Sequence, residues 1–300
     1  MEIAKTARRS DAITFVVFTY NEEKRLEWAI KNFLPWGRLL VVDNYSEDRT
    51  VEIAKSYGCE VLLNKNAGWV EDAVTVSRVK AAVQTEWIYW GFADELVSAE
   101  TLDAIIAAVE SGKHSIVNIA RKNHYYGKFC YDAFADRLNR IFRKEAIDFS
   151  NNTIHLFGTP TVPESSICFL DSKRHYVHHY ISYVAKNYCN VMDRYTDTQA
   201  TGTADRFSGL SLWKTMFFLF ARSAKLVVWN LLLRGGYKAG AAGLYLVLEN
   251  VYYQWLLNMK DYERRNGLSV AEVERLNDAD RGKLLNPDVG VSGAIRPAMR

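Results

Sequence analysis

The chain has 300 residues, of which 49% are hydrophobic, 13% aromatic and 24% charged, and this composition excludes a disordered, collagen-like or low-complexity protein. The formal net charge is only +3, so we expect no nucleic-acid partner. The four cysteines show no Cys-x-x-Cys spacing, which argues against a disulfide framework or a zinc site. Residues 1–11 are charged and lack the apolar segment of a secretory signal, so we expect a cytoplasmic protein.

Residues 12–122 alternate between short apolar runs and segments with helical periodicity, which is typical of βα units and a mainly parallel sheet. Strands are predicted, in chain order, at residues 13–18, 38–42, 60–63, 87–90 and 115–119. Helices are predicted between them at residues 26–33, 49–57, 70–83 and 102–109. Ser98 is suited to cap the last of these helices. The predicted fold class is therefore α/β.

The regular alternation ends near residue 122. Residues 123–205 are rich in aromatic residues, His and Arg, and predict loops and an antiparallel extension of the same domain. A third segment, residues 206–265, is expected to form a helical extension, and the polar residues 266–300 a loosely packed tail. Between residues 206 and 248 there is no Asp or Glu, and the six basic residues are Arg206, Lys214, Arg222, Lys225, Arg234 and Lys238.

Residues 212–233 are very apolar, but Arg222 and Lys225 leave no uncharged run near the ~20 residues that cross a bilayer. On a helical wheel, Trp213 and Phe217 share one side and the basic residues fall on another. A basic helix with an aromatic stripe favours binding in the headgroup plane of the inner-membrane surface. The alternative is a buried helical hairpin or the interface of a homo-oligomer.

Polar residues follow three of the predicted strands, at residues 19–23, 43–48 and 91–95. In a parallel α/β sheet, ligands bind beyond the carboxyl ends of the strands. Each run alone is compatible with a simple turn or a helix cap. Taken in order they are more specific, and they predict that Tyr20, Asp43 and Asp94 converge on one site.

This ordered set resembles glycosyltransferase family 2, the inverting nucleotide-sugar enzymes with the GT-A fold. The matching segments are residues 18–23, 41–55, 93–95, 123–128 and 140–144. The layout over residues 12–265 looks most like the branch that modifies lipopolysaccharide core or capsule sugars. The resemblance implies a mostly parallel GT-A sheet flanked by helices, with a C-terminal helical extension at a membrane or in an oligomer. It also implies a nucleotide-sugar donor and a glycan or lipid-linked acceptor.

The resemblance also implies roles for single residues. The nucleotide pocket would be lined by Thr19, Tyr20, Glu22 and Asp43, with Asp43 holding the base or the ribose. Asp94, alone or with Glu95, would hold Mg²⁺ or Mn²⁺ against the diphosphate. The family normally has Asp-x-Asp at this strand end, whereas Phe92 replaces the first carboxylate here.

Three further assignments stay open at the level of the sequence. Arg140 supplies positive charge at the diphosphate or else faces solvent on a strand. The catalytic base is His155 or Glu164, and the alternative for His155 is a histidine satisfied within a loop. The residue pattern at Phe92 and after His155 also permits a degenerate protein that binds a nucleotide or glycan as a scaffold. The cluster of His175, His178 and His179 is interpreted as aromatic packing rather than as a metal site.

Overall fold

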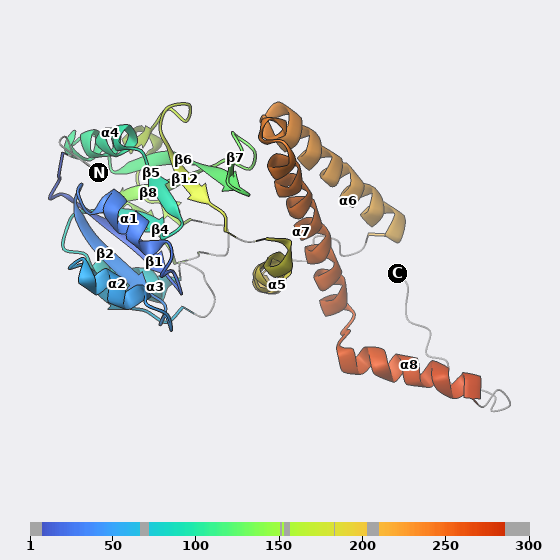
Figure 1. Ribbon diagram of the computed structural model, residues 1–300. Helices are drawn as coiled ribbons and strands as arrows, with labels where there is room; N and C mark the ends of the chain where they lie inside the picture. Colours follow the sequence, from blue (N-terminus) through green and yellow to red (C-terminus); the bar gives the residue numbers. More distant parts are fainter. Residues whose placement is uncertain are drawn as a thin grey trace. The chain divides into compact units, whose positions relative to one another are not determined.

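The computed structural model describes residues 8–66, 72–150, 152, 157–182, 184–202 and 210–285 (Figure 1). The chain divides into two compact units. The first consists of Met1–Val184 and Asn230–Leu246, and the second of Ala185–Trp229 and Val247–Arg300. These divisions differ from the boundaries expected at residues 122, 205 and 265, because a segment late in the chain returns to the first unit.

The first unit contains a ten-stranded sheet in the described part of the chain, with the order β3-β2-β1-β4-β8-β6-β12-β5 and with β7 and β11 paired to β6. Its strands are β1 Ile13–Thr19, β2 Arg38–Asp43, β3 Glu60–Leu63, β4 Trp87–Phe92, β5 Glu95–Val97, β6 Ile116–Tyr125, β7 Lys128–Phe129, β8 Asp136–Arg143, β11 Ile167–Phe169 and β12 Tyr176–Tyr180. A separate hairpin joins β9 Ile147–Asp148 to β10 Thr159–Pro160.

The sheet is parallel on one side and mixed on the other. Strands β3, β2, β1 and β4 run parallel, and β8 runs antiparallel to both β4 and β6. Strands β6 and β12 are parallel to each other, so they point in the same direction as β4. The predicted α/β class and the antiparallel extension after residue 122 are therefore confirmed.

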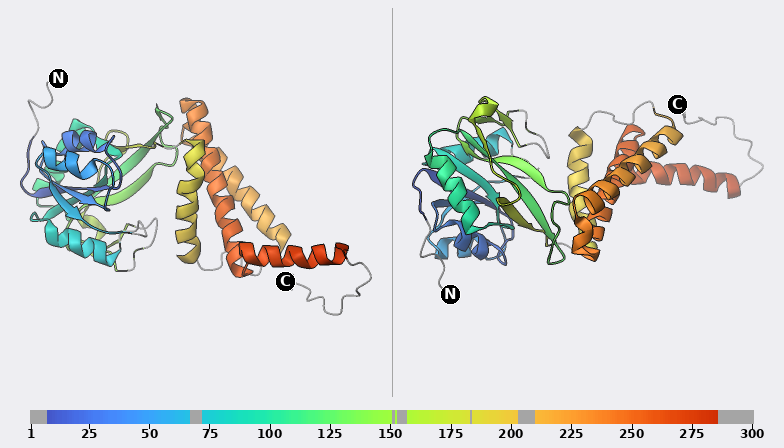
Figure 2. Two further views of the ribbon diagram at one scale, coloured as in Figure 1. Left: turned by 60° about the horizontal axis from the view of Figure 1, so that its bottom comes forward. Right: turned by 90° about the horizontal axis from the view of Figure 1, so that it is seen from above.

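Helices cover both faces of this sheet, as two further views show (Figure 2). Helices α1 Leu26–Phe33, α2 Thr50–Ser56 and α4 Ala99–Glu110 contribute to one apolar core, and α3 Ala73–Ala82 contributes to the other. Helix α4 begins as predicted, because the Ser98 side chain accepts a hydrogen bond from the Thr101 amide at 3.2 Å. Helix α3 is shorter than predicted, because Asp72 caps it by accepting from the Thr75 amide at 2.7 Å.

The apolar strands are buried on both faces, which explains their nearly continuous hydrophobic sequence. In β1, Phe15 and Val17 enter the core beneath α1, whereas Val16 enters the core beneath α3. The register places Thr19 opposite Asp43 and Phe18 opposite Phe92. The polar residues that follow β1, β2 and β4 are thereby delivered to one edge of the sheet.

Residues 230–246 belong to the first unit although they lie far along the chain. The Asn230 side chain accepts from the Phe134 amide at 2.9 Å, and Arg234 donates to the carbonyl of Ala135 at 2.9 Å. This segment contains the end of the π-helix η2 Val227–Leu233 and the short helix η3 Gly236–Ala239.

Gly243 allows a close backbone approach in this segment, and we expect Gly243→Ala to lower the free energy of unfolding by about 1–3 kcal/mol. A Cβ atom at Gly243 would lie 1.9 Å from the carbonyl oxygen of Gly236, so the backbone would have to move. Urea denaturation measures the change. The control is Gly282→Ala, where no heavy atom lies within 4 Å and stability should not fall. Equal stability of the two variants would contradict this account of the segment.

The second unit is helical and contains α5 Ala185–Gly202, α6 Leu212–Leu226, most of α7 Ala241–Arg265, and α8 Val270–Leu285. Helices α5 and α7 are joined by Lys260, whose amine lies 2.5 Å from Asp193 and 2.6 Å from Asp197. Helices α6 and α7 are joined by Trp255, which donates to the Ser223 hydroxyl at 2.9 Å. The sequence analysis predicted neither α5 nor α8.

Candidate active site

The ends of β1 and β2 are held together by Asp43. This residue is fully buried, and its carboxylate accepts hydrogen bonds from the Thr19 hydroxyl at 2.9 Å and from the Ser46 amide at 2.8 Å. The Ser46 hydroxyl donates a third bond at 2.5 Å. Asp43 therefore fixes the loop after β2 against the end of β1, and much of its hydrogen-bonding capacity is used within the protein.

The loops after β1 and β2 also contact each other. The Asn21 amide donates to the Ser46 hydroxyl at 2.8 Å, and the Glu22 amide donates to the Thr50 hydroxyl at 2.7 Å. Asn21 and Tyr45 have φ values of 55° and 60°, a left-handed conformation that costs energy in residues other than glycine. These interlocked loops form a fixed rim at the carboxyl edge of the sheet, with Tyr20 on it partly exposed.

Charged residues that follow β1 interact with the carboxylate of Asp94, which follows β4. The Glu22 carboxylate accepts two hydrogen bonds from the Arg25 guanidinium, each of 2.5 Å. Burial raises the pKa of Glu22, and the negative charge of Asp94 raises this pKa further, although the Arg25 pairing lowers it. Thus Glu22, Arg25 and Asp94 belong to one group of charges, of which the sequence analysis placed Glu22 and Asp94 in the site.

Asp94 is a partly exposed carboxylate in a cationic setting. Its side chain is 26% exposed, and its Oδ2 atom lies 3.4 Å from Nε2 of His179. Burial alone would raise the pKa of Asp94, but the charges of His179, Arg25 and Arg121 outweigh burial and hold this pKa at about 2. Asp94 is therefore an anion at neutral pH.

His179 contacts acceptors through both ring nitrogens. Its Nδ1 atom lies 2.8 Å from Oδ1 of Asn123, while the amide nitrogen of Asn123 donates to the carbonyls of Ala133 and Phe134. Both ring nitrogens of His179 therefore face oxygen atoms of the protein. The sequence analysis did not assign His179, Asn123, Arg25 or Arg121 to the site. Their position at strand ends or after β1 was the available signal.

Glu95 and Arg140 do not reach this rim. Glu95 is fully buried and accepts a hydrogen bond from Arg140, which is also buried and stacks its guanidinium 5.2 Å from the Phe92 ring. A second guanidinium, that of Arg121, lies 3.5 Å from Glu95. The structure therefore pairs Glu95 and Arg140 with each other, instead of offering one to a metal and the other to solvent or a diphosphate.

Of the two residues predicted as the catalytic base, only Glu164 lies within the described part of the chain. Glu164 begins the short helix η1 Glu164–Ser166, directly before β11, which pairs with the start of β6 at Ile116. Asn123, which contacts the Asp94 group through His179, lies seven residues further along β6, about 23 Å away at ~3.3 Å per residue. The fold therefore does not place Glu164 near Asp94. His155 lies outside the described residues.

The three histidines of β12 and its preceding turn have three different partners. His175 lies 3.4 Å from the Thr101 hydroxyl, His178 lies 2.9 Å from Nε2 of His124, and His179 contacts Asp94. Alternation along β12 separates His178 from His179 onto opposite faces. Within the described ranges, no group of three or more His, Cys, Asp and Glu side chains is arranged to hold a metal ion.

The His124–His178 pair makes stability depend on pH. Burial and the charges of His178 and His179 lower the pKa of His124 to about 4. The unfolded chain binds a proton on His124 near pH 6.5, whereas the folded chain does so only near pH 4. We therefore expect the free energy of unfolding to fall by roughly 1–2 kcal/mol from pH 7 to pH 4, a value reduced for solvent screening.

Urea denaturation across this pH range measures the effect. The His124→Phe variant should lose part of the pH dependence, because the titrating group is removed while the ring remains. His114→Phe, at a histidine outside this pair, is the control. A pH dependence that is identical in the parent and in His124→Phe would contradict the assignment.

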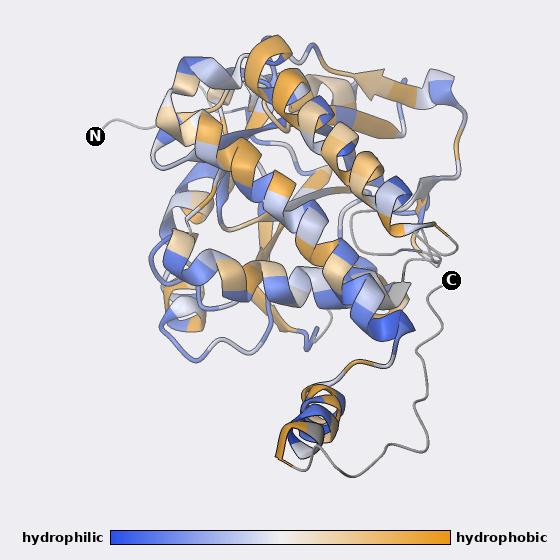
Figure 3. Ribbon diagram, turned by 90° about the vertical axis from the view of Figure 1, so that its right-hand side faces the viewer, coloured by the Kyte–Doolittle hydropathy of each residue, from blue (hydrophilic) through white to orange (hydrophobic). Residues whose placement is uncertain are grey.

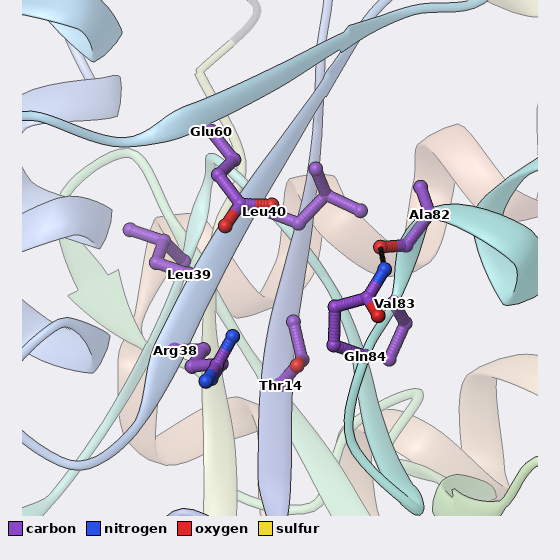
Figure 4. A pocket seen from close by; sticks show the side chains of 8 residues that line it. All are labelled: Thr14, Arg38, Leu39, Leu40, Glu60, Ala82, Val83 and Gln84. Carbon is purple, nitrogen blue, oxygen red and sulfur yellow. Dashed lines mark hydrogen bonds between the residues drawn. The ribbon is translucent and has the colours of Figure 1, made fainter.

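A small pocket elsewhere does not belong to this site (Figure 4). It lies at the amino ends of β1 and β2, and it is lined by Thr14, Arg38, Leu39, Leu40, Glu60, Ala82, Val83 and Gln84. The rim at Asp43 and Asp94 lies at the other end of the same strands.

Comparison with known proteins supports the family suggested by the strand ends. The family model for Glycosyl transferase family 2 matches residues 14–161. An uncharacterized glycosyltransferase of Rickettsia typhi is 31% identical over 146 residues, which cover 46% of this chain and 48% of that protein. The chain therefore spans about half the length of this curated relative.

Two solved structures are similar at low identity. Glucosyl-3-phosphoglycerate synthase from Mycobacterium tuberculosis, in complex with Mn²⁺ and uridine-diphosphate-glucose, is 19% identical, with a TM-score of 0.30 over 39% of this chain and 44% of that chain. S. aureus TarS is 14% identical, with a TM-score of 0.42 over 86% of this chain and 56% of that chain. Residues 14–161 are therefore similar to glycosyltransferase family 2, and the order of the strands and their polar ends agrees with the GT-A fold.

Proposed function

We propose that this protein transfers a glycosyl group from a nucleotide-sugar donor to a glycan or lipid-linked acceptor, with inversion at the transferred carbon. The observation that carries the proposal is the convergence of the ends of β1, β2 and β4 on one rim. That rim contains Asp43 at one end and the group of Glu22, Arg25 and Asp94 at the other. A nucleotide diphosphate needs such a combination of a shaped pocket and positive charge.

In this proposal the nucleotide lies along the rim. Thr19, Tyr20 and Asp43 shape the end that receives the base or ribose, and Asp43 does so by fixing the loop that carries Ser46. The diphosphate lies at the Asp94 end, where the charges of Arg25, Arg121 and His179 surround the carboxylate. Fixed positive charges at the position where negative charge develops stabilise the departing nucleotide.

A divalent metal fits this site through Asp94 alone. Mg²⁺ is held in many proteins by one or two carboxylates together with substrate phosphates and water, and Asp94 is ionised and partly exposed. Glu95 does not fit, because it is buried and paired with Arg140. When bound, Mg²⁺ or Mn²⁺ supplies additional positive charge to the leaving diphosphate.

Transfer with inversion occurs in one displacement, in which a hydroxyl group of the acceptor attacks the donor sugar. This step also needs a general base that takes the proton of that hydroxyl group. We propose His155 for this role, because Glu164 lies at the opposite end of β6 from the Asp94 group. His155→Ala should lower turnover of the donor without weakening nucleotide binding. A variant as active as the parent would remove His155 from the mechanism.

Calorimetry with UDP, in the presence and absence of Mn²⁺, tests the nucleotide site directly. We expect UDP to bind, and we expect Mn²⁺ to tighten its binding in the parent but not in Asp94→Asn. Mass spectrometry of a donor panel then tests transfer. UDP binding without turnover of any donor would favour the scaffold that the sequence also permits, and absence of nucleotide binding would contradict both proposals.

We also propose that the protein binds the cytoplasmic face of the inner membrane through α6. Figure 3, coloured by hydropathy, shows hydrophobic residues along much of this helix. Trp213 and Phe217 are 79% and 78% exposed, whereas Leu219 on the side toward α7 is buried. By length and composition, Leu212–Leu233 is also apolar enough to cross a membrane.

The charges on α6 favour a position in the headgroup plane. Lys214 and Lys225 lie together along one side of the exposed stripe, and residues 206–248 contain no carboxylate to oppose an anionic leaflet. Each basic residue near such a surface contributes on the order of 1 kcal/mol. A protein so placed would reach lipid-linked acceptors, which supports a role in cell-envelope polysaccharide or lipopolysaccharide synthesis.

Flotation with phosphatidylglycerol-containing liposomes tests this placement. The parent should float and should be released by high salt, while Lys214→Glu/Lys225→Glu should stay in the soluble fraction. Lys55→Glu/Lys113→Glu, at two exposed residues outside α6, is the charge-matched control. Retention on membranes after carbonate extraction would show a spanning helix instead, and a soluble dimer that does not float would show that α6 is an oligomer interface.

A further inference from the structure

Five aromatic rings lie together on the sheet face opposite His179. They are His124, Phe129, Tyr176, His178 and Tyr180, and we call them the ring platform. They share a face because β6 and β12 pair in register, with Lys122 opposite His178 and His124 opposite Tyr180. Strand β7 adds Phe129 through its pairing with His124.

The rings form a connected surface. His124 stacks on Tyr180 with centroids 4.4 Å apart and an interplanar angle of 24°. Phe129 stacks on Tyr176 at 5.8 Å and 24°, and Tyr176 contacts His178 at 4.8 Å. The planes of His178 and Tyr180 differ by only 17°. Within each stacked pair the ring faces are turned toward each other, so the platform presents ring edges and the outer face of an end ring such as Tyr180.

The platform is not part of an apolar core. None of its residues belongs to the three core clusters of the described chain, and Tyr180 is 37% exposed. Leaving aromatic surface in water is unfavourable at roughly 25 cal/mol per Å². The other four rings are half-buried, and partly exposed aromatic groups of this kind commonly mark ligand or protein contacts.

The edges of the platform are polar. His124 and His178 share a hydrogen bond of 2.9 Å, and the Lys122 amine lies 4.5 Å from the centre of the Tyr176 ring and 2.8 Å from Asp132. An exposed aromatic ring, that of Tyr180, with donors and acceptors on the neighbouring rings matches a pyranose. A pyranose has an apolar face of C–H groups, which carry partial positive charge toward a π-face, and a rim of hydroxyl groups.

The platform lies at the edge of the sheet that carries the candidate active site. Strands β6 and β12 run in the same direction as β4, so His124 and Tyr180 lie at the carboxyl ends of their strands. The Tyr180 amide donates to the carbonyl of Asp94 at 2.8 Å. Tyr180 therefore neighbours His179, which contacts Asp94, although the Tyr180 ring lies on the other face of the sheet.

We propose that the ring platform is a carbohydrate-binding subsite that stacks a pyranose ring of the acceptor glycan. This inference rests on the proposed transferase function, since it places an acceptor sugar at the same carboxyl edge of the sheet as Asp94. A lipid tail would leave the polar edges of the rings unused. A nucleobase already has its proposed position between β1 and β2, on the other side of Asp94.

Saturation-transfer NMR on the full chain tests the subsite. The probes are neutral oligosaccharides of glucose, galactose, mannose and N-acetylglucosamine, each with and without UDP. At least one should bind the parent, and Tyr180→Ala should weaken that binding roughly tenfold, the effect of about one lost stacking contact. Tyr180→Phe should bind nearly as the parent does. Tyr176→Leu is a second test should Tyr180→Ala not fold.

The control is Trp28→Ala, which removes a 60% exposed aromatic side chain from α1, outside the platform. UDP affinity, measured by calorimetry, should change less than twofold in all variants. Absence of saccharide binding by a parent that binds UDP would overturn the platform alone. Equal loss in Trp28→Ala and Tyr180→Ala would do so as well. Failure of the parent to bind UDP would instead count against the proposed function.

Discussion

Asp94→Asn should reduce glycosyl transfer about 10²–10³-fold while the protein remains folded. The substitution keeps the size of the side chain but removes the negative charge that lies 3.4 Å from His179 and among the charges of Arg25 and Arg121. It therefore removes the carboxylate proposed to hold a metal, while Arg25 keeps its pairing with Glu22 and Arg121 keeps its contact with Glu95. Release of UDP from the donor identified in the panel measures the rate.

Asp103→Asn is the matched control, because Asp103 is an exposed carboxylate on α4. Its rate should equal that of the parent. Thermal unfolding of Asp94→Asn should show a single transition close to that of the parent. An Asp94→Asn variant as active as the parent would contradict the assignment of Asp94, whatever the identity of the acceptor.

Arg140→Leu should lower the free energy of unfolding by about 3–5 kcal/mol, because it leaves a buried carboxylate without its main partner. Glu95 is fully buried, and after this change only Arg121, at 3.5 Å, would balance its charge. Urea denaturation measures the loss. The double variant Glu95→Leu/Arg140→Leu should recover most of it, because an apolar pair has no charge to desolvate.

Variants of Glu95 and Arg140 also distinguish the two roles considered for Glu95, which are a structural ion pair and a metal ligand. If Glu95 stabilises the sheet, Glu95→Gln should lower stability and leave the Mn²⁺ dependence of UDP binding unchanged. If Arg140→Leu is as stable as the parent, and Glu95→Gln abolishes the effect of Mn²⁺, the structural role is contradicted and Glu95 is a metal ligand.

The sequence was sufficient to predict the first half of the fold. The apolar runs of β1, β2 and β4 are buried on both faces, so their hydrophobicity is strong and local. The polar residues after these strands were predicted to meet because parallel strands end at one edge of the sheet. The structure joins Thr19 to Asp43 and places Glu22 near Asp94.

The roles of the neighbouring carboxylates Asp94 and Glu95, at the start of β5, were harder to predict from the sequence. Asp94 and Glu95 are neighbours in sequence, which suggested a shared metal site. Glu95 begins β5, where its side chain enters the sheet interior toward Arg140, whereas Asp94 stays in the turn and is partly exposed. Side chains alternate between the two faces of a strand, and a motif of consecutive carboxylates does not show which one turns inward.

Long-range pairing concealed the remaining site residues. His179 meets Asp94 only because β12 inserts between β5 and β6, and no local pattern predicts that pairing. The same insertion builds the ring platform from residues more than fifty positions apart. Helices α5 and α8 were missed for a different reason, since their sequences are polar and their apolar periodicity is weak.

A crystal structure of the full chain with UDP and Mn²⁺ tests the central claim most directly, namely that the ends of β1, β2 and β4 form one nucleotide site. The account predicts the base between Tyr20 and Asp43 and the diphosphate beside Asp94, within reach of Arg25 and His179. UDP bound in the pocket between Thr14 and Glu60, or at any position away from Asp94, would contradict it.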